Sequence, residues 1–419
     1  MEAMDIQAVE SKLSDVTVTA IPMTGKSVHK DIGHGANSHA TISSVPAASP
    51  SSVGKDKDNG TSKYAQLSTW LRAKLRWNTG YNADSVEWCP VETYHDVLVC
   101  GIYHLVQKDE KDIKESRLGR IHLFQIDGNT EKLTLMQTIE SAGILDQKWC
   151  YHTIQGVPVL AAASSTGEII LFKLINESGQ LTLKLWLKEC IGETNMALSL
   201  DWATNRTASN EPMLLVSSFL GEVHIWKVVG DELLKIGVWN GHQHQAWIGA
   251  FNYWDDNLFY SGGDDPKHTF KSFDRRSPEA VAVPKAHAAG VTAIRSHVDV
   301  EHRLITGSYD ETVCIWDTRN LGAYVTRSHA KGGAWRLKWH PVDPTKLLVA
   351  GMYDGFRVLN IRNDDVTVFC EYLEHESIAY GADWKFGETN EPWTVATCSF
   401  YDCQMHVGAV RKLRSDEPR

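Results

Sequence analysis

The chain has 419 residues, a length that favours either two domains or a repeat architecture over a single compact core. Its 42 basic and 52 acidic residues give a formal charge of −10, and this balance argues against a direct nucleic-acid partner. The sequence contains no run of about 18 apolar residues and no basic start followed by an apolar stretch. We therefore expect a cytoplasmic protein without a membrane partner.

The cysteines and histidines show no metal-binding spacing. The eight cysteines are scattered and include no C-x-x-C pair, which is typical of reduced thiols in a core. The pattern H-E-x-x-H of zinc hydrolases is also absent from the sequence. We predict neither a metal site nor a cofactor.

The N-terminal segment has a different composition from the rest of the chain. Residues 1–63 contain no Phe, Tyr or Trp and are rich in Ser, Thr, Gly, Ala, Asp and Lys. Such a segment cannot bury enough apolar surface to offset the entropy lost on ordering. We predict that residues 1–63 form a disordered tail.

From residue 84 onwards a strand pattern repeats. Short apolar strands such as "SVEWCP", "LSLDWA" and "WRLKWHP" share one landmark position near their ends. The landmarks lie 61, 53, 49, 45, 43 and 45 residues apart, and the later intervals match the roughly 40–45-residue period of WD repeats, which have four strands in each propeller blade. The landmark residues are Trp88, Trp149, Trp202, Phe251, Ser296, Trp339 and Trp384.

These repeats predict an all-β fold, a seven-bladed WD-repeat β-propeller. Each entry strand is followed by second and third strands, and outer strands follow in every blade except the last. The segment "AQLSTWLRAKLRW" at 65–77 is available to complete that blade and close the ring, which removes exposed sheet edges. We predict a tail at 1–63, a propeller at 64–410 closed by strand 65–77, and a short polar tail at 411–419.

An ordered set of motifs points to one family. "ADSVEWCP", "ILDQKWC", "AWIGAFNYW", "YSGGDD", "GSYDE", "IWDTRN", "GAWRLKWHP", "YGADW" and "ATCSFYD" resemble the WD-repeat diphthine methyl ester hydrolases of diphthamide biosynthesis. The resemblance extends over nearly the whole predicted propeller.

The resemblance implies an enzyme that acts on a protein. Its substrate would be elongation factor 2 with a modified histidine, whose intermediate bears a trimethylammonium and a methyl ester, and the reaction would release methanol. A non-catalytic WD-repeat scaffold for protein partners is the alternative, because most propellers of this type serve that role.

The sequence lacks the G-x-S-x-G turn of many esterases, so hydrolysis needs residues that converge on one propeller face. The loops and turns of the face around the channel carry His242, His244 and Asp264, our catalytic candidates, because a His paired with an Asp can activate water. WD repeats also use such pairs as structural ties between a loop and its blade, and we expect His287 and Asp310 to form one.

Aromatic residues suggest how the substrate binds. Trp247, Trp335 and Tyr380 stand four positions before their landmarks, at the channel end of the strands, and Tyr309 lies in a nearby turn. Aromatic faces commonly hold quaternary ammonium groups, although these rings would equally pack a channel mouth. Arg336 is a candidate to bind the ester oxygen, with a structural salt bridge or a solvated surface position as the alternatives.

Overall fold

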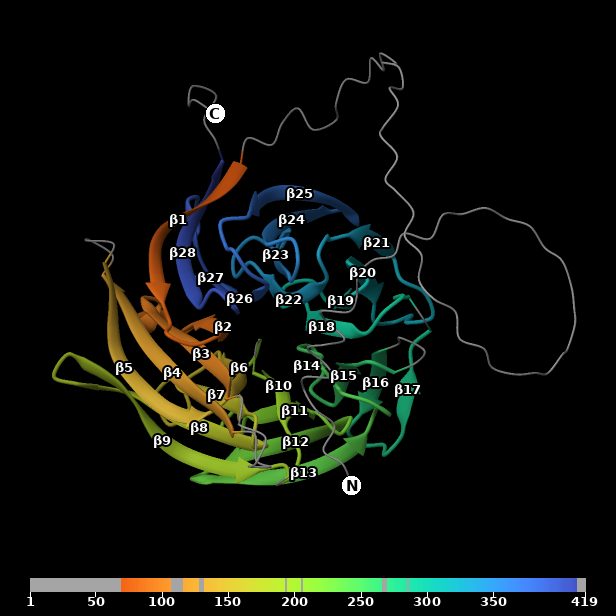
Figure 1. Ribbon diagram of the computed structural model, residues 1–419. Helices are drawn as coiled ribbons and strands as arrows, with labels where there is room; N and C mark the ends of the chain where they lie inside the picture. The colour runs from red at the N-terminus through yellow and green to blue at the C-terminus, as the bar shows by residue number, and fades with distance from the viewer. Residues whose placement is uncertain are drawn as a thin grey trace, which may run out of the picture. The chain divides into compact units, whose positions relative to one another are not determined.

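The computed structural model describes residues 69–106, 116–127, 132–192, 194–204, 206–265, 270–284 and 286–412. These residues form seven four-stranded sheets, arranged as blades around a central channel (Figure 1). The predicted all-β, seven-bladed WD-repeat propeller is confirmed. The predicted disordered tail, residues 1–63, lies outside the described residues.

The strands follow one order in each blade, from the channel outwards. The innermost strands are β2 (Ala83–Trp88), β6 (Ile144–Trp149), β10 (Ala197–Trp202), β14 (Ile248–Phe251), β18 (Val291–Ser296), β22 (Ala334–Trp339) and β26 (Ala379–Trp384). The second strands are β3 (Val97–Val106), β7 (Val159–Ser164), β11 (Met213–Ser218), β15 (Leu258–Gly262), β19 (Arg303–Ser308), β23 (Lys346–Gly351) and β27 (Trp393–Ser399).

The outer half of each blade is more exposed. The third strands are β4 (Ser116–Asp127), β8 (Glu168–Glu177), β12 (Glu222–Val229), β16 (Phe270–Asp274), β20 (Thr312–Asp317), β24 (Phe356–Arg362) and β28 (Gln404–Lys412). The outermost strands are β5 (Lys132–Ala142), β9 (Gln180–Cys190), β13 (Glu232–Asn240), β17 (Ala280–Ala282), β21 (Thr326–His329), β25 (Asp365–Tyr372) and β1 (Thr69–Asn78). One short 3-10 helix, η1 (Glu92–Tyr94), precedes β3. No described helix has the length and hydrophobicity that a membrane span requires.

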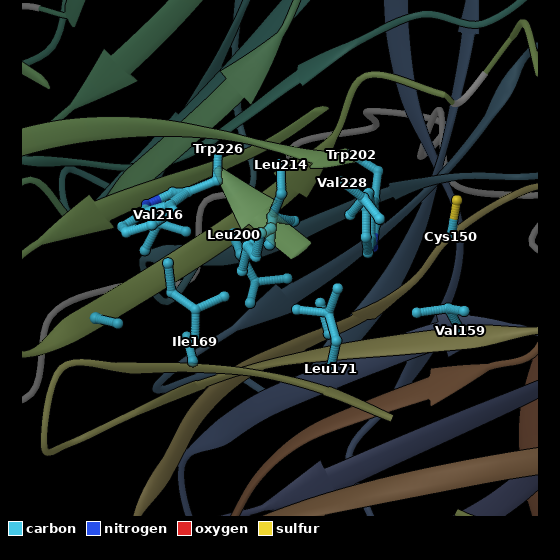
Figure 2. Packing of buried hydrophobic residues seen from close by; sticks show 14 of the residues in the cluster. Cys150, Val159, Ile169, Leu171, Leu200, Trp202, Leu214, Val216, Trp226 and Val228 are labelled. Atoms are coloured by element: carbon cyan, nitrogen blue, oxygen red, sulfur yellow. The ribbon is translucent and has the colours of Figure 1, made fainter. Parts of the chain in front are cut away.

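Apolar side chains pack between neighbouring blades and form the core. Figure 2 shows one such cluster, which joins the β6–β9 blade to the β10–β13 blade through Leu171, Leu200, Trp202 and Val216. Each of these side chains is at most 1% exposed. Burial of a side chain of this size contributes about 1.5–3 kcal/mol, so the contacts between blades are a major source of stability for each sheet.

In four of the seven blades the landmark residue ties its inner strand to the one before it. Three landmark indole N–H groups and one hydroxyl donate hydrogen bonds of 2.8 to 3.3 Å to carbonyls of the preceding inner strand. The bonds run from Trp149 to Glu87, from Trp202 to Lys148, from Trp384 to Lys338 and from Ser296 to Phe251. In these four blades the landmark position makes a polar contact between blades, and Ser296 makes it with a hydroxyl in place of an indole. The indole N–H groups of Trp88 and Trp339 have no hydrogen-bond partner among the described residues.

The two ends of the described propeller meet in the last blade. β1 pairs with β28, and the order of this sheet is β1-β28-β27-β26. Trp77 of β1 also contacts Phe124 of the first blade edge to face, with ring centroids 5.3 Å apart. β1 begins at Thr69, since residues 65–68 of the expected strand lie outside the described residues, and β28 continues through Lys412.

Truncation tests this closure. Removal of residues 1–80 deletes β1 and leaves β28 without its outer neighbour, so we expect the melting temperature to fall by on the order of 5–10 °C. Removal of residues 1–60 leaves β1 whole and should leave the melting temperature unchanged, because this segment has no aromatic side chain to bury. Thermal unfolding followed by circular dichroism measures both, and identical melting of all three chains would contradict the closing role of β1.

Candidate functional site

In six of the seven blades a bulge at the start of the inner strand displaces one residue at the same end of the channel. In β2, β6, β10, β18, β22 and β26 the pairing register shifts by one residue after the first position. Such bulges re-aim side chains and are frequent beside active sites. The skipped residues are Asp84, Leu145, Leu198, Thr292, Trp335 and Tyr380. We call the channel end where the inner strands begin the entry mouth, and the opposite end the exit mouth.

The aromatic residues predicted from the sequence meet at the entry mouth. The ring of Trp335 is stacked with Tyr380, with centroids 5.1 Å apart. Its centroid lies 5.7 Å from that of Trp247, which precedes β14, and 5.9 Å from that of Tyr309 in the β19–β20 turn. Trp247, Tyr309 and Trp335 are half-buried, so their cluster packs the mouth and still presents ring surface to solvent.

Arg336 places a buried positive charge beside this cluster. The residue is 7% exposed, which excludes the solvated surface position considered from the sequence. Its Nη2 donates to the Leu145 carbonyl oxygen at 3.1 Å and lies 3.7 Å from Asp146 and 3.8 Å from Asp84. The guanidinium carbon is 5.5 Å from the Trp335 ring centroid. A fixed cation in this position can stabilise negative charge that develops on a bound oxygen.

Asp84 is a functional candidate that the sequence reasoning missed. It is 5% exposed, and its Oδ1 has no hydrogen-bond partner among the described residues. Burial raises the pKa of Asp84 to about 8, against the opposing charge of Arg336 and with a contribution from Asp146. A buried carboxyl group that titrates near neutral pH suits a general acid or base.

A signal for Asp84 was present in the sequence. It stands four positions before the landmark Trp88, the same offset that identified Trp335 and Tyr380. The aromatic pattern at this offset does not include Asp84, whereas the offset alone identifies it in the first repeat.

His242 forms a structural tie. Its Nδ1 lies 3.0 Å from Asp265 Oδ2 and its Nε2 lies 2.6 Å from the Ser261 hydroxyl oxygen, so both ring nitrogens are occupied. The structure thus pairs His242 with Asp265 and not with its neighbour Asp264. His287 and Asp310 form the expected tie of the next blade, at 3.3 Å.

The other two catalytic candidates, His244 and Asp264, do not form a pair with each other. His244 is exposed and makes no hydrogen bond or ion pair with any described residue. Asp264 packs against Gly290 and lies close to Tyr309, whose pKa is raised by burial and further by the charge of Asp264. Within the described ranges no group of three or more His, Cys, Asp or Glu side chains could hold a metal ion.

Ion pairs cross the middle of the channel and separate the two mouths. The Nζ of Lys338 in the sixth blade lies 2.6 Å from a carboxylate oxygen of Glu87 in the first blade. It also lies 3.3 Å from a carboxylate oxygen of Asp383 in the seventh blade. Glu87 is also 3.4 Å from Lys148, which pairs with Asp146 at 2.9 Å. All five side chains are buried, and along the inner strands they lie between the level of Asp84 and the exit mouth.

The raised pKa of Asp84 predicts a pH-dependent stability. The contribution of Asp84 to the free energy of unfolding is largest below pH 3.8, the ordinary pKa of an Asp side chain. It is lost as the pH rises to about 8, because Asp84 ionises in the unfolded chain at a lower pH than in the folded protein. The Asp84→Asn variant should therefore gain stability relative to the wild type over this range, by at most about 1.4 kcal/mol per pH unit. Urea denaturation at a series of pH values measures the difference, and parallel profiles would contradict a raised pKa.

Two family models match the chain. Residues 278–317 match the model of the WD domain, G-beta repeat, and residues 1–72 match the model of the cyclin-dependent kinase 2-associated protein. A chain in the crystal structure of the mitotic checkpoint complex has a similar fold, with a TM-score of 0.59. The likeness covers 88% of this chain and 98% of that chain at 14% sequence identity, so it shows the propeller fold alone.

The chain also has relatives with named activities. The diphthine methyltransferase of Mus musculus is 39% identical over 335 residues, which cover 75% of this chain and 70% of the relative. The diphthine methyltransferase of Homo sapiens is 36% identical and covers 74% of each chain. The diphthine methyltransferase homolog of Dictyostelium discoideum is 32% identical, over 77% of this chain and 95% of the relative. These relatives confirm the family expected from the sequence motifs: the chain belongs to the diphthine methyltransferase family.

Proposed function

We propose that this protein removes the methyl group from the methyl ester of methylated diphthine on elongation factor 2, by hydrolysis, during diphthamide biosynthesis. The observation that carries the proposal is the entry mouth, where aromatic rings, a buried carboxyl group and a buried guanidinium group converge. These are the three chemical groups that a substrate with a quaternary ammonium and an ester requires. Because the substrate is a translation factor, the proposal includes a cytoplasmic location.

The aromatic cluster would bind the trimethylammonium group. This group is bulky, permanently charged and unable to donate a hydrogen bond, so the negative faces of aromatic rings suit it better than a hydrogen-bond acceptor does. The rings of Trp335 and Tyr380 stack on each other, which leaves no room for an ammonium between them. The half-exposed indoles of Trp247 and Trp335 supply the faces that it would contact.

Asp84 and Arg336 would perform the hydrolysis. The Asp84 carboxylate accepts a proton from water as the water oxygen attacks the ester carbonyl carbon, and the Arg336 guanidinium stabilises the resulting oxyanion. The tetrahedral intermediate then expels the methoxy group, which takes the proton back from Asp84 and leaves as methanol. The product is the free carboxylic acid, and Asp84 returns to its starting state.

Two other readings remain as outcomes of one experiment. The name diphthine methyltransferase of the relatives suggests methyl transfer, and a propeller can serve as a scaffold without any chemistry. Purified protein is incubated with elongation factor 2 bearing the methylated intermediate, with and without a sulfonium methyl donor, and the modified peptide is weighed by mass spectrometry. Hydrolysis predicts loss of one methylene together with methanol release, without the donor. A mass gain that needs the donor, or no change in either reaction, would overturn the proposal.

Substitution of Asp84 tests its role. Asp84→Asn should lower kcat by about 100-fold or more, because general acid-base catalysis contributes about 10²–10⁴. Wild-type kcat/KM should rise with pH up to about 8 as the carboxyl group ionises, and Asp84→Asn should lose this dependence. Leu198→Met, at the same ring position of the third blade, is the matched control and should retain activity. Normal turnover by Asp84→Asn would remove Asp84 from the mechanism.

Substitution of the rings tests the binding mode. Trp335→Leu retains apolar bulk but removes the aromatic face, so substrate affinity should fall roughly three- to thirty-fold. Trp247→Leu should behave alike, whereas Tyr380→Leu removes a buried ring that supports Trp335 and should act mainly on thermal stability. Trp186→Leu on the outer strand β9 is the control. Affinity is measured in the Asp84→Asn background, which prevents turnover, alongside thermal unfolding. Rings that only pack the mouth predict the reverse, a loss of about 2–4 kcal/mol in stability with unchanged affinity.

A further inference from the structure

The exit mouth holds a cavity that the proposed reaction does not use. Its volume is about 420 Å³, within the range of small-molecule sites, and residues on or after all seven inner strands line it. Arg295, Lys338 and Asp383 form its inner end, and Pro90, Tyr151 and Phe386 contribute to its walls. The ion pairs across the channel lie between this cavity and the entry mouth, so the two sites are separate.

Arg295 is the polar group that defines this cavity. The residue is 8% exposed, and its Nη1 donates to Asp201 at 2.8 Å and to the Tyr253 hydroxyl oxygen at 2.7 Å. Its Nε and Nη2 have no hydrogen-bond acceptor among the described residues. These two nitrogens form one edge of the guanidinium fork, the edge that matches two oxygens of a carboxylate or phosphate. A guanidinium edge that no protein oxygen occupies can pair with two oxygens of a bound anion.

The remaining lining residues favour a ligand with an apolar body. Tyr151 and Phe386 meet edge to face with centroids 5.9 Å apart, and Trp339 is half-buried beside them in the lining. Asp383 also lines the cavity, and its carboxyl group repels a bound anion least when it is protonated and neutral. Burial raises its pKa to about 7, with Lys338 opposing and Glu87 reinforcing the shift.

We propose that the exit-mouth cavity binds a small organic anion, whose carboxylate or phosphate oxygens accept hydrogen bonds from Arg295 and whose flat apolar body lies against Tyr151 and Phe386. The shared chemistry is an oxyanion joined to a ring. The proposal is independent of the hydrolysis at the entry mouth, because it uses none of the residues of that site.

Calorimetric titration of the full chain with four probes tests the ligand class. Benzoate and phenyl phosphate carry both an oxyanion and a ring, inorganic phosphate lacks the ring, and benzamide lacks the charge. Saturable binding of benzoate, phenyl phosphate or both, each tighter than inorganic phosphate and benzamide, supports the proposal, and the tighter of the two identifies the oxyanion. Equal binding of benzamide, or no saturable binding of either ring-bearing anion, would overturn it.

Variants locate the binding. Arg295→Lys retains a cation for Asp201 but lacks the guanidinium fork, so affinity for the anion should fall about tenfold or more. Phe386→Leu shortens the apolar wall without touching an ion pair and should weaken binding even if Arg295→Lys fails to fold. Trp335→Leu at the entry mouth is the matched control and should bind the anion as the wild type does. Wild-type affinity in Phe386→Leu and in folded Arg295→Lys would show that the anion binds elsewhere.

Discussion

Charged side chains buried in the centre of the channel must pair with one another, and the arrangement of both mouths depends on this constraint. Six of the seven inner strands carry a charged residue immediately before the landmark position, namely Glu87, Lys148, Asp201, Arg295, Lys338 and Asp383. An unpaired charge in such surroundings would cost several kcal/mol. Two of the pairs join blades that are not neighbours, Arg295 with Asp201 at 2.8 Å and Lys338 with Glu87 at 2.6 Å. These pairs therefore hold blades together across the channel, in addition to the contacts between adjacent blades.

This network also orients the chemistry of the entry mouth. Arg336 lies beside Asp146, which is held by Lys148 and accepts the backbone N–H of Leu200 at 3.0 Å. The guanidinium group thus lies 3.8 Å from the bulge residue Asp84. The bulge residues at the starts of the inner strands lie at the entry mouth, and the ion pairs lie deeper in the channel. The same ion pairs border the inner end of the exit-mouth cavity.

Most of the fold was predictable because it rests on local repeats. The landmark recurs at the same place in every inner strand, so the repeat is found even where Ser296 replaces Trp, and in four blades the landmark donates a hydrogen bond to the preceding inner strand. The missing outer strand of the last blade pointed directly to the segment that forms β1. The limits of such strands were less predictable, as the continuation of β28 to Lys412 illustrates, because pairing with β1 and not composition extends it.

The site was only partly predictable, since its residues are far apart in the sequence. The fixed offset from the landmark predicted that Trp247, Trp335 and Tyr380 would meet, and the ring contacts agree. Which Asp pairs with His242 depends on one residue in a turn, and spacing alone could not choose between Asp264 and Asp265. Contacts such as Lys338 with Glu87, 251 residues apart, follow from ring closure and leave no local trace in the sequence.

The central claim is that the entry mouth, not the exit mouth, receives the modified histidine. The most direct measurement is a crystal structure of the Asp84→Asn variant with a short peptide that carries the trimethylammonium methyl ester. The account predicts the ammonium group on the faces of Trp247 and Trp335, and the ester carbonyl oxygen within about 3.5 Å of Arg336. A peptide seated in the cavity beside Arg295, with the entry mouth unchanged, would contradict it.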